Sequence, residues 1–527
     1  MSDQTSSDVA TSVPDDDRIT PDILKIAGVV VLGAIMSILD ITVVNVALPT
    51  FQEAFDVSEL STVAWSVTGY TLALAAVIPL TGWAADRFGT KRLYMTAIGL
   101  FTLGSVLCAA AWSIESLVAF RVLQGLGGGM LMPLGMTIMT KAAGPHRMGR
   151  LMAILGIPML LGPIMGPILG GWLIEIASWH WIFLINLPLG LAALVCAQVI
   201  LPKDQAQPSE SFDVVGMLLM SPGLALFLFG VSSIPETGTV ESARVLVPSI
   251  IGALLIVGFV FWAFRPQHPL LDLRLFKDRN LTVATITMFL FVGAFFGALL
   301  LVPTYFQQVR GESVLQAGLL VAPQGIGAML TMPIAGTLVD RMPVGRIVPF
   351  GFVAIIVGVI GLAASTDPGT PLWHIMGWLF VMGLGMGGTM MPIFTSALKT
   401  LRSHEVARGS TLINVVQQVA SSIGVAIMTV LLTNGFKDSA AVTAGQALAE
   451  AERQGVQPPA EAAEVAQRLG DGFQATVLQD MADAFQHTYV VALVLILVAL
   501  VPVAFMPRKR EASHLLDDEG RPPVVVH

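Results

Sequence analysis

The chain has 527 residues, of which 54% are hydrophobic and 12% are charged, and its mean hydropathy is +0.77. Soluble globular proteins carry about 25% charged residues, so this composition excludes a chain whose surface lies mostly in water. The net charge of −8 comes without any block of Lys and Arg, which argues against a nucleic-acid partner. Cys108 and Cys196 both lie in apolar runs, so we expect neither a disulfide framework nor a metal cluster.

The first 23 residues are polar and acidic, and we expect them to form a disordered cytoplasmic tail. A helix that crosses a bilayer needs about 20 mostly apolar residues. Fourteen such segments follow in chain order, at 24–47, 60–81, 92–112, 116–140, 149–174, 180–201, 214–234, 246–264, 281–306, 316–338, 346–365, 375–398, 409–433 and 485–506. Because helices satisfy their own backbone polar groups in lipid, the sequence predicts an all-α integral membrane bundle.

The distribution of Lys and Arg tests this topology, because both residues gather in cytoplasmic loops. With the N-terminus inside, the segments that fall inside hold 22 of them and those outside hold 5, while Arg121 lies within a span. The alternation persists to the end of the chain. It predicts a multi-pass protein of the bacterial inner membrane with both termini, including the tail 507–527, in the cytoplasm.

One long outside loop, 435–484, is rich in Ala, Glu and Gln and contains Pro458-Pro459. Two short amphipathic helices on either side of the proline pair are expected. The loop is either a solvated cap or a lid that guides the substrate.

The second part of the chain repeats the first. Gly82, Asp86 and Arg87 recur at the same spacing as Gly336, Asp340 and Arg341, and Lys141, His146 and Arg150 recur as Lys399, His404 and Arg408. The repeat predicts a six-helix bundle at 24–201, two linker helices at 202–264 and a second six-helix bundle at 281–506. Transporters built from such repeats bind substrate near the midplane between the halves and rock around it.

Five segments carry a family resemblance: 39–49 in the first span, 82–92 after the second, 121–127 in the fourth, 162–171 in the fifth and 179–190 at the sixth. Together they resemble the major facilitator superfamily, specifically its fourteen-helix drug:proton antiporter branch (EmrB/QacA type). The resemblance implies the major facilitator fold, with 14 transmembrane helices as two six-helix bundles plus two linker helices.

The chain departs from that pattern at three places. Ala153 stands where the fifth-helix motif often has a glycine, and His180 replaces a common arginine between two tryptophans. Several relatives that carry dicationic drugs have an acid in the thirteenth span, where this chain has Asn414, Gln417 and Gln418. This last difference argues against multiply cationic substrates.

Asp40 and Arg121 are the charged residues that lie deep in predicted spans. An ionisable group inside a membrane is a functional hypothesis by default, and arginine stays charged. We expect the two to pair directly or through water, with Asp40 taking up a proton from outside and releasing it inside. A static structural pair is the alternative. The resemblance likewise implies a proton-coupling role for Arg121.

Two glycine-containing motifs are candidate gates. The resemblance implies that the loop of Gly82, Asp86, Arg87, Gly89, Lys91 and Arg92, with its second copy at Asp340 and Arg341, latches the two halves while the transporter faces outward. Alternatively, its basic residues only set the topology. The second copy has fewer basic residues and is expected to form the weaker latch.

The other motif comprises Gly162, Gly166, Pro167, Gly170 and Gly171 in the fifth span. Small residues at every fourth position let helices pack backbone to backbone. The resemblance implies an outer gate that blocks proton leak.

Ligand pockets are mostly apolar with a few placed polar groups. On this basis the candidate substrate contacts are Asn45, Trp65, Tyr70, Gln124, Phe291, Phe295, Tyr305, Asn414, Gln417 and Gln418. For each, packing inside the bundle is the alternative.

The leading hypothesis for function is proton-coupled export of small amphipathic drugs, toxins or metabolites. No Walker motif is present, so the expected energy source is the proton gradient and not ATP. We expect no cofactor and no metal. One alternative is an exporter of lipids, siderophores or a self-made antibiotic. From another class, a membrane enzyme or sensor is the alternative, but the spans show no nucleophile–base set for an enzyme. We expect a monomer, and the need for a periplasmic adaptor stays open.

Overall fold

The computed structural model describes residues 19–57, 60–144, 147–203, 211–234, 239–402 and 404–509, so most of both predicted tails lies outside the described residues. Within these ranges all regular structure is helical. The first half contains α1 (Pro21–Val46), α2 (Leu48–Ala54), α3 (Leu60–Phe88), α4 (Thr90–Ala109), α5 (Ile114–Ala143), α6 (Met148–Ile176), α7 (Trp181–Leu184) and α8 (Asn186–Ile200). Two further helices, α9 (Val214–Ser232) and α11 (Ala243–Trp262), follow.

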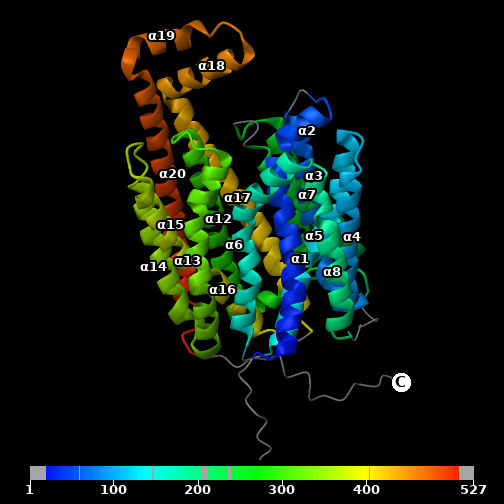
Figure 1. Ribbon diagram of the computed structural model, residues 1–527. Helices are drawn as coiled ribbons and strands as arrows, with labels where there is room; N and C mark the ends of the chain where they lie inside the picture. Colours follow the sequence, from blue (N-terminus) through cyan, green and yellow to red (C-terminus); the bar gives the residue numbers. More distant parts are fainter. Residues whose placement is uncertain are drawn as a thin grey trace, which may run out of the picture.

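The second half begins after the short 3-10 helix η1 (Leu273–Lys277). It contains α12 (Arg279–Gln308), α13 (Val314–Arg341), α14 (Val344–Ala363), α15 (Leu372–Gly387), α16 (Met390–Lys399), α17 (Val406–Asp438), α18 (Ala440–Gln454), α19 (Ala460–Leu469), the 3-10 helix η2 (Gly470–Gly472) and α20 (Phe473–Ala504). Figure 1 shows the long helices standing side by side, with α18 and α19 projecting beyond one end of α17 and α20.

Thirteen helical segments in the described part of the chain are long and apolar enough to cross a membrane. Three of them join consecutive helices: α7 with α8, α15 with α16, and α19 and η2 with α20. The predicted fifth span is α6, which is 29 residues long and packs against α1 and α13. The predicted all-α fold is confirmed, and α6, which is not one of the thirteen segments, corresponds to the remaining predicted span.

The last span and the long loop have different bounds from those predicted. Helix α17 continues to Asp438 and α20 begins at Phe473, so the segment outside these two helices is shorter than 435–484. Hydropathy marks only the part of a helix inside lipid, whereas backbone hydrogen bonds continue into water. The two expected short helices are present as α18 and α19, on either side of Pro458-Pro459.

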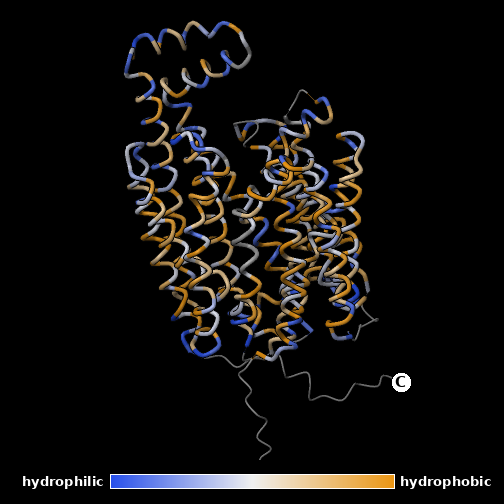
Figure 2. Tube along the Cα trace, in the orientation of Figure 1, coloured by the Kyte–Doolittle hydropathy of each residue, from blue (hydrophilic) through white to orange (hydrophobic). Residues whose placement is uncertain are grey.

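Helices α9 and α11 pack together and against both halves. Met220 of α9 and Phe259 of α11 lie in one apolar cluster with Ile78 of α3 and Val415 of α17. The pair therefore lies against one helix of each bundle. In Figure 2 the middle of the bundle is mostly hydrophobic, and hydrophilic residues concentrate at its ends and in the α18–α19 hairpin.

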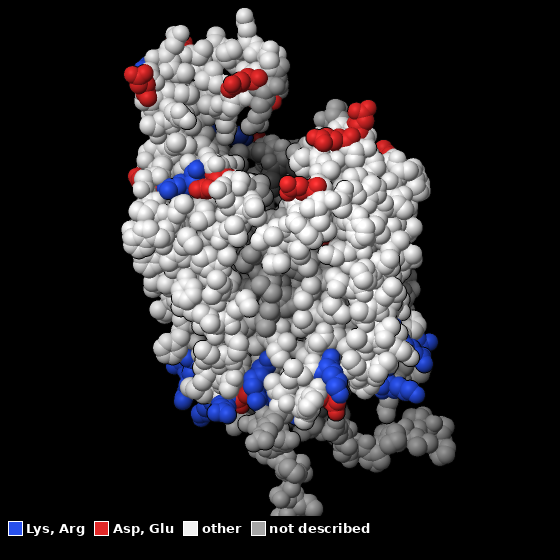
Figure 3. Space-filling model, in the orientation of Figure 1, with Lys and Arg blue, Asp and Glu red and all other residues white. Residues whose placement is uncertain are grey.

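Charge is distributed unequally between the two ends of the bundle. Figure 3 shows most of the visible Lys and Arg at the end where α1 begins, and most of the visible Asp and Glu at the opposite end. The same view shows the molecule hollowed between its two halves at the acidic end.

The glycines of α6 form its contact with α1. A Cβ added at Gly162 would lie 2.1 Å from Ile38 Cγ2, and one at Gly166 would lie 2.1 Å from Thr42 Oγ1. At Gly170 the neighbour is the backbone oxygen of Val43, 3.2 Å away. The predicted close packing is confirmed for Gly162, Gly166 and Gly170. The side chain of Pro167 lies outside the described residues.

Gly166 and Gly171 give a matched test of this contact, because a Cβ at Gly171 would meet nothing within 4 Å. Overpacking costs about 1–3 kcal/mol, so we expect Gly166→Ala to lower the thermal unfolding temperature of the purified protein by several degrees. Gly171→Ala should leave it unchanged. Equal unfolding temperatures for the two variants would show that α1 moves aside without cost.

Candidate functional site

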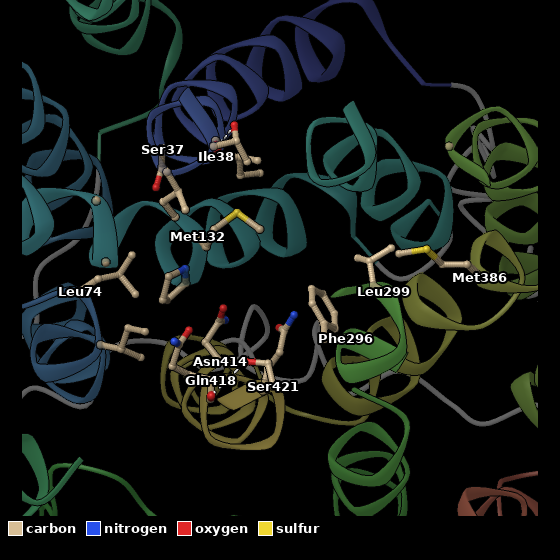
Figure 4. Close-up of a pocket in the computed structure, with 18 of the residues that line it drawn as sticks. Ser37, Ile38, Leu74, Met132, Phe296, Leu299, Met386, Asn414, Gln418 and Ser421 are labelled. Atoms are coloured by element: carbon tan, nitrogen blue, oxygen red, sulfur yellow. Dashed lines mark hydrogen bonds between the residues drawn. The ribbon is translucent and has the colours of Figure 1, made fainter. Parts of the chain in front are cut away.

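A central cavity of about 310 Å³ lies between the two halves. Figure 4 shows side chains from α1, α3 and α5 facing side chains from α12 and α17 across it. The residues that line it are Ser37, Ile38, Ile41, Thr42, Leu74, Ile78, Gly128, Gly129, Met132, Pro133, Phe296, Leu299, Val321, Gln324, Gly325, Met386, Asn414, Gln417, Gln418 and Ser421. Both halves contribute, and none of these residues carries a charged side chain.

The polar side chains of the cavity are mainly amides. Asn414 is anchored, because its Nδ2 donates to the Ser410 carbonyl at 2.8 Å. Gln324 of α13 is 4% exposed, and its Oε1 is buried without a hydrogen-bond partner among the described residues. A buried polar atom without a partner is costly. Gln324 is therefore a candidate to bind a hydrogen-bond donor of the substrate.

A buried ion pair lies beside this cavity. The Arg121 guanidinium on α5 donates through Nη1 to Asp40 Oδ2 on α1, and both side chains are fully buried. Gln124 bridges the pair, because its Nε2 donates to Asp40 Oδ1 at 2.7 Å and its Oε1 accepts from Arg121 Nη1 at 2.8 Å. Arg121 Nε also donates to the Ser66 carbonyl at 2.9 Å. The predicted pairing of Asp40 with Arg121 is thus direct.

Further polar groups complete the environment of the pair. Asn186, at the start of α8, donates to Asp40 Oδ1 at 3.4 Å and to the Ser105 hydroxyl at 3.1 Å. The Arg121 guanidinium lies over the Tyr70 ring, 4.0 Å from its centroid, which is a cation–π contact. A buried charge is tolerated only when it is paired and hydrogen-bonded, and this cluster meets that condition for Asp40.

At the basic end of the bundle, ion pairs between described residues connect the two halves. Asp86 of α3 accepts from Arg408 Nε of α17 at 3.2 Å. Asp340 of α13 accepts from Arg150 Nε of α6 at 3.1 Å. Each acid belongs to one copy of the repeat and each arginine to the other half, so the two pairs cross.

Backbone contacts accompany each pair. A Cβ at Gly82 would lie 3.3 Å from the Arg408 Cα, and one at Gly336 would lie 2.6 Å from the Gly149 carbonyl oxygen. A Cβ at Gly336 would require the backbone of α6 to move, whereas one at Gly82 would be tight and would require its neighbours to shift slightly. The two halves therefore touch at the basic end while they are apart at the acidic end.

In the second copy of the motif, the acid binds a backbone donor as well as an arginine of the opposite half. Asp340 also accepts from the backbone N–H of Gly149 at 2.8 Å, at the first turn of α6, and its side chain is 5% exposed against 14% for Asp86. A carboxylate at a helix N-terminus is stabilised by the helix dipole. Counting basic residues missed this, because Asp340 uses a backbone donor.

The basic residues of the first copy play different local parts. Lys91 Nζ donates to the carbonyls of Gln198 and Leu201, both at 2.7 Å, and so holds the end of α8. Gly89 adopts a positive φ of 91° in the turn before α4, which explains the glycine there. Arg87 is half-buried, whereas Arg92 and, in the second copy, Arg341 are exposed.

Comparison with known proteins identifies the family. The profile described as Major Facilitator Superfamily matches residues 30–425, which is most of the chain. This chain belongs to the major facilitator superfamily.

Two of its sequence relatives have names that refer to multidrug resistance or multidrug export. The "Multidrug resistance protein B homolog" of Mycobacterium tuberculosis (strain ATCC 25618 / H37Rv) is 48% identical over 94% of this chain and 92% of its own length. The "Multidrug export protein EmrB" of Escherichia coli (strain K12) is 31% identical over 76% of this chain and 79% of its own.

Solved structures show the same fold at low identity. The human organic anion transporter MFSD10 gives a TM-score of 0.56 at 15% identity, with 91% of this chain and 100% of that chain covered. The proton:xylose symporter XylE gives 0.53 at 15% identity, with coverages of 95% and 99%.

The predicted substrate contacts of this transporter divide into two groups. Asn414, Gln417 and Gln418 line the cavity. Phe291 and Phe295 do not, because they stack on each other inside the second bundle, where Phe291 also packs on Phe352 of α14. Both phenylalanines are thus part of the bundle core in this structure.

The other candidates also lie away from the cavity lining. Tyr305 donates to the Thr366 carbonyl at 2.9 Å, Trp65 stacks on Phe229 of α9, and Asn45 is exposed. Tyr70 and Gln124 belong to the charge cluster described above.

Several residues at the site were not singled out from the sequence. Arg150 and Arg408 were recognised only as repeated basic positions, although each binds an acid of the opposite half. Asn186 was part of a motif without an assigned contact. An amide side chain in an apolar span needs a polar partner, and this could have marked Asn186 as a candidate. Gln324 gave a similar signal.

Phe296 and Phe291 test the distinction between cavity and core. Phe296 lines the cavity, while Phe291 is fully buried in the bundle. We expect Phe296→Ala to change the relative resistance of cells to different drugs by several-fold at unchanged protein level. Burial of Phe291 implies that Phe291→Ala costs about 3–5 kcal/mol and lowers the protein level instead. The reverse pattern would place the substrate elsewhere.

Proposed function

We propose that this transporter exports small amphipathic compounds in exchange for protons by alternating access. The observation that carries the proposal is the buried Asp40–Arg121 pair next to the cavity between the halves. An acid inside the membrane and beside a substrate cavity is suited to carry a proton inward for each substrate that moves outward. The names of the two sequence relatives, which refer to multidrug resistance and multidrug export, support the direction and the substrate class.

Helix α1 connects substrate binding in the cavity with protonation of Asp40. Ser37, Ile38, Ile41 and Thr42 line the cavity, and Asp40 of the same helix binds Arg121. Protonation of Asp40 from the open side would neutralise it and weaken its hold on Arg121, which frees α1 to shift along the glycine face of α6. Such a shift is how we propose that the proton drives the rocking of the halves.

We propose that the structure represents the outward-facing state of this cycle. Lys and Arg gather on the cytoplasmic side, so the end closed by Asp86–Arg408 and Asp340–Arg150 is the inner one. On this basis we propose that both termini are cytoplasmic. We also propose that the transporter works as a monomer, since one chain contains the whole cavity.

The cavity supports neutral or singly charged amphipathic substrates. Its lining is largely apolar with amide groups, and none of its residues is an acid. A dication in such a site would lack a counter-charge and would lose most of its hydration, which is costly.

Reconstituted liposomes test the proposal directly. With an imposed pH gradient and membrane potential, chloramphenicol (neutral) and tetraphenylphosphonium (one positive charge) should accumulate uphill, while pentamidine (two charges) should not. The available energy is about 2.3 kcal/mol per charge per 100 mV. Uphill accumulation that persists after an uncoupler has collapsed both gradients would refute proton exchange. Transport of pentamidine alone would refute the substrate class.

A further inference from the structure

Tyr70 lies between the cavity and the ion pair. It is fully buried on α3, and its ring lies 4.0 Å beneath the Arg121 guanidinium carbon. Its hydroxyl lies 3.2 Å from the Ser37 hydroxyl on α1. One end of this side chain thus contacts the charge cluster and the other end contacts a residue of α1.

The hydroxyl end lies directly behind the cavity wall. Ser37 and Gly128 both line the cavity. A Cβ at Gly128 would lie 2.5 Å from the Tyr70 hydroxyl oxygen, so glycine lets the hydroxyl reach this position. Asp40, Arg121 and Gln124 are not among the cavity-lining residues, whereas two residues that contact Tyr70 are.

Arg121 is able to respond to a displacement of the ring. Its Nη2 is buried and has no hydrogen-bond partner among the described residues. The guanidinium is therefore held by Nη1, by Nε and by the ring face. A cation–π contact weakens when the ring moves from under the cation, and the hydrogen bond to Asp40 must then readjust.

We propose that Ser37 and Tyr70 form the route by which substrate in the cavity changes the proton affinity of Asp40. Tyr70 is a positioning residue. A substrate that contacts Ser37 shifts the Tyr70 hydroxyl, and the ring moves relative to Arg121. Arg121 then binds the carboxylate of Asp40 more strongly, and Asp40 releases its proton to water on the inner side. This inference rests on the proposed proton exchange and adds the residues that connect it to the substrate.

The groups that face this route come from several helices. They are Asp40 on α1, Arg121 and Gln124 on α5, and Cys108 on α4, whose thiol donates to Gln124 Oε1 at 3.6 Å. Coupling between two ligands is reciprocal. If substrate lowers the proton affinity, a rise in pH must tighten substrate binding by the same factor.

Tyr70→Phe removes the hydroxyl and keeps the ring under Arg121. Tyr94→Phe is the matched control, because Tyr94 on α4 is equally buried and its hydroxyl donates to the carbonyls of Val29 and Val30 of α1, both at 3.3 Å, but contacts neither Asp40 nor Arg121. Ser37→Ala removes the other hydroxyl of the route.

The experiment measures two quantities on the detergent-purified full chain, with chloramphenicol and tetraphenylphosphonium as probes. One is the number of protons released per probe bound, and the other is the ratio of the probe Kd at pH 6 to that at pH 8. We expect wild type and Tyr94→Phe to release protons and to bind more tightly at pH 8. In Tyr70→Phe both quantities should fall several-fold, while the Kd at pH 8 changes by less than about threefold, because Tyr70 does not line the cavity. In Ser37→Ala, which alters the cavity wall itself, both quantities should also fall several-fold.

The outcomes separate this inference from the proposed function. If wild type and Tyr70→Phe release the same number of protons, proton exchange stands and the route is wrong. If Tyr94→Phe falls as far as Tyr70→Phe, the effect is one of general packing and the route is again wrong. If wild type binds both probes without releasing protons, the proposed proton exchange itself fails, and this inference fails with it.

Discussion

Asp40→Asn is expected to abolish uphill transport while substrate exchange without a gradient continues. Asparagine has the shape of a protonated carboxyl group but cannot release a proton. One pH unit is worth about 1.4 kcal/mol, or tenfold in an equilibrium. A gradient of about two units thus supports roughly 100-fold accumulation in a one-for-one exchange, and the variant should give a ratio of about one.

The measurement must separate coupling from folding. Breaking a buried pair costs about 3–5 kcal/mol, because Arg121 is left without a counter-charge. Asp213→Asn is the matched control: Asp213 is a buried acid that accepts from Gly216 N–H at 2.8 Å and from Trp262 Nε1 at 2.9 Å, at the start of α9. It should lose stability but keep its coupling. Equal uphill transport by folded Asp40→Asn and wild type would exclude Asp40 as the proton carrier.

Arg408→Asp is expected to open the inner end of the transporter. The change places two carboxylates opposite each other where Asp86 now binds Arg408 at 3.2 Å, with both side chains largely buried. A shift of only about 1.4 kcal/mol changes the ratio of the two states tenfold, so we expect at least a tenfold loss of transport. The exchanged variant Asp86→Arg/Arg408→Asp should recover part of it.

Labelling reports the opening itself. Ser410 is fully buried at the contact between the halves, where its hydroxyl donates to the Pro133 carbonyl at 2.7 Å. A cysteine placed there, in a chain without Cys108 and Cys196, should react with a maleimide from the inner side faster in Arg408→Asp than in the parent. Arg402→Asp makes the same charge change at an exposed residue and should have less than a twofold effect. Equal labelling in both variants would show that the ion pair does not hold the inner end closed.

The sequence was sufficient for those features that depend on a single strong signal. Long apolar runs located the membrane helices, and the recurrence of Gly82, Asp86 and Arg87 located the repeat. Arg121 was the one basic residue deep in a predicted span and Asp40 the acid at similar depth, so the pair followed from the cost of burying a lone charge in lipid. The glycine spacing in α6 indicated close packing because no other side chain fits such contacts.

The tertiary structure alone decided what each apolar face contacts. Phe295 and Phe296 are neighbours in α12, yet the first packs in the bundle and the second lines the cavity. Lipid, protein core and substrate cavity are all apolar, so hydropathy cannot tell them apart. The ion pairs of Arg408 and Arg150 with acids of the opposite half likewise depend on how the halves meet. A basic residue in a loop indicates on which side of the membrane the loop lies, but it does not specify which acid the residue binds.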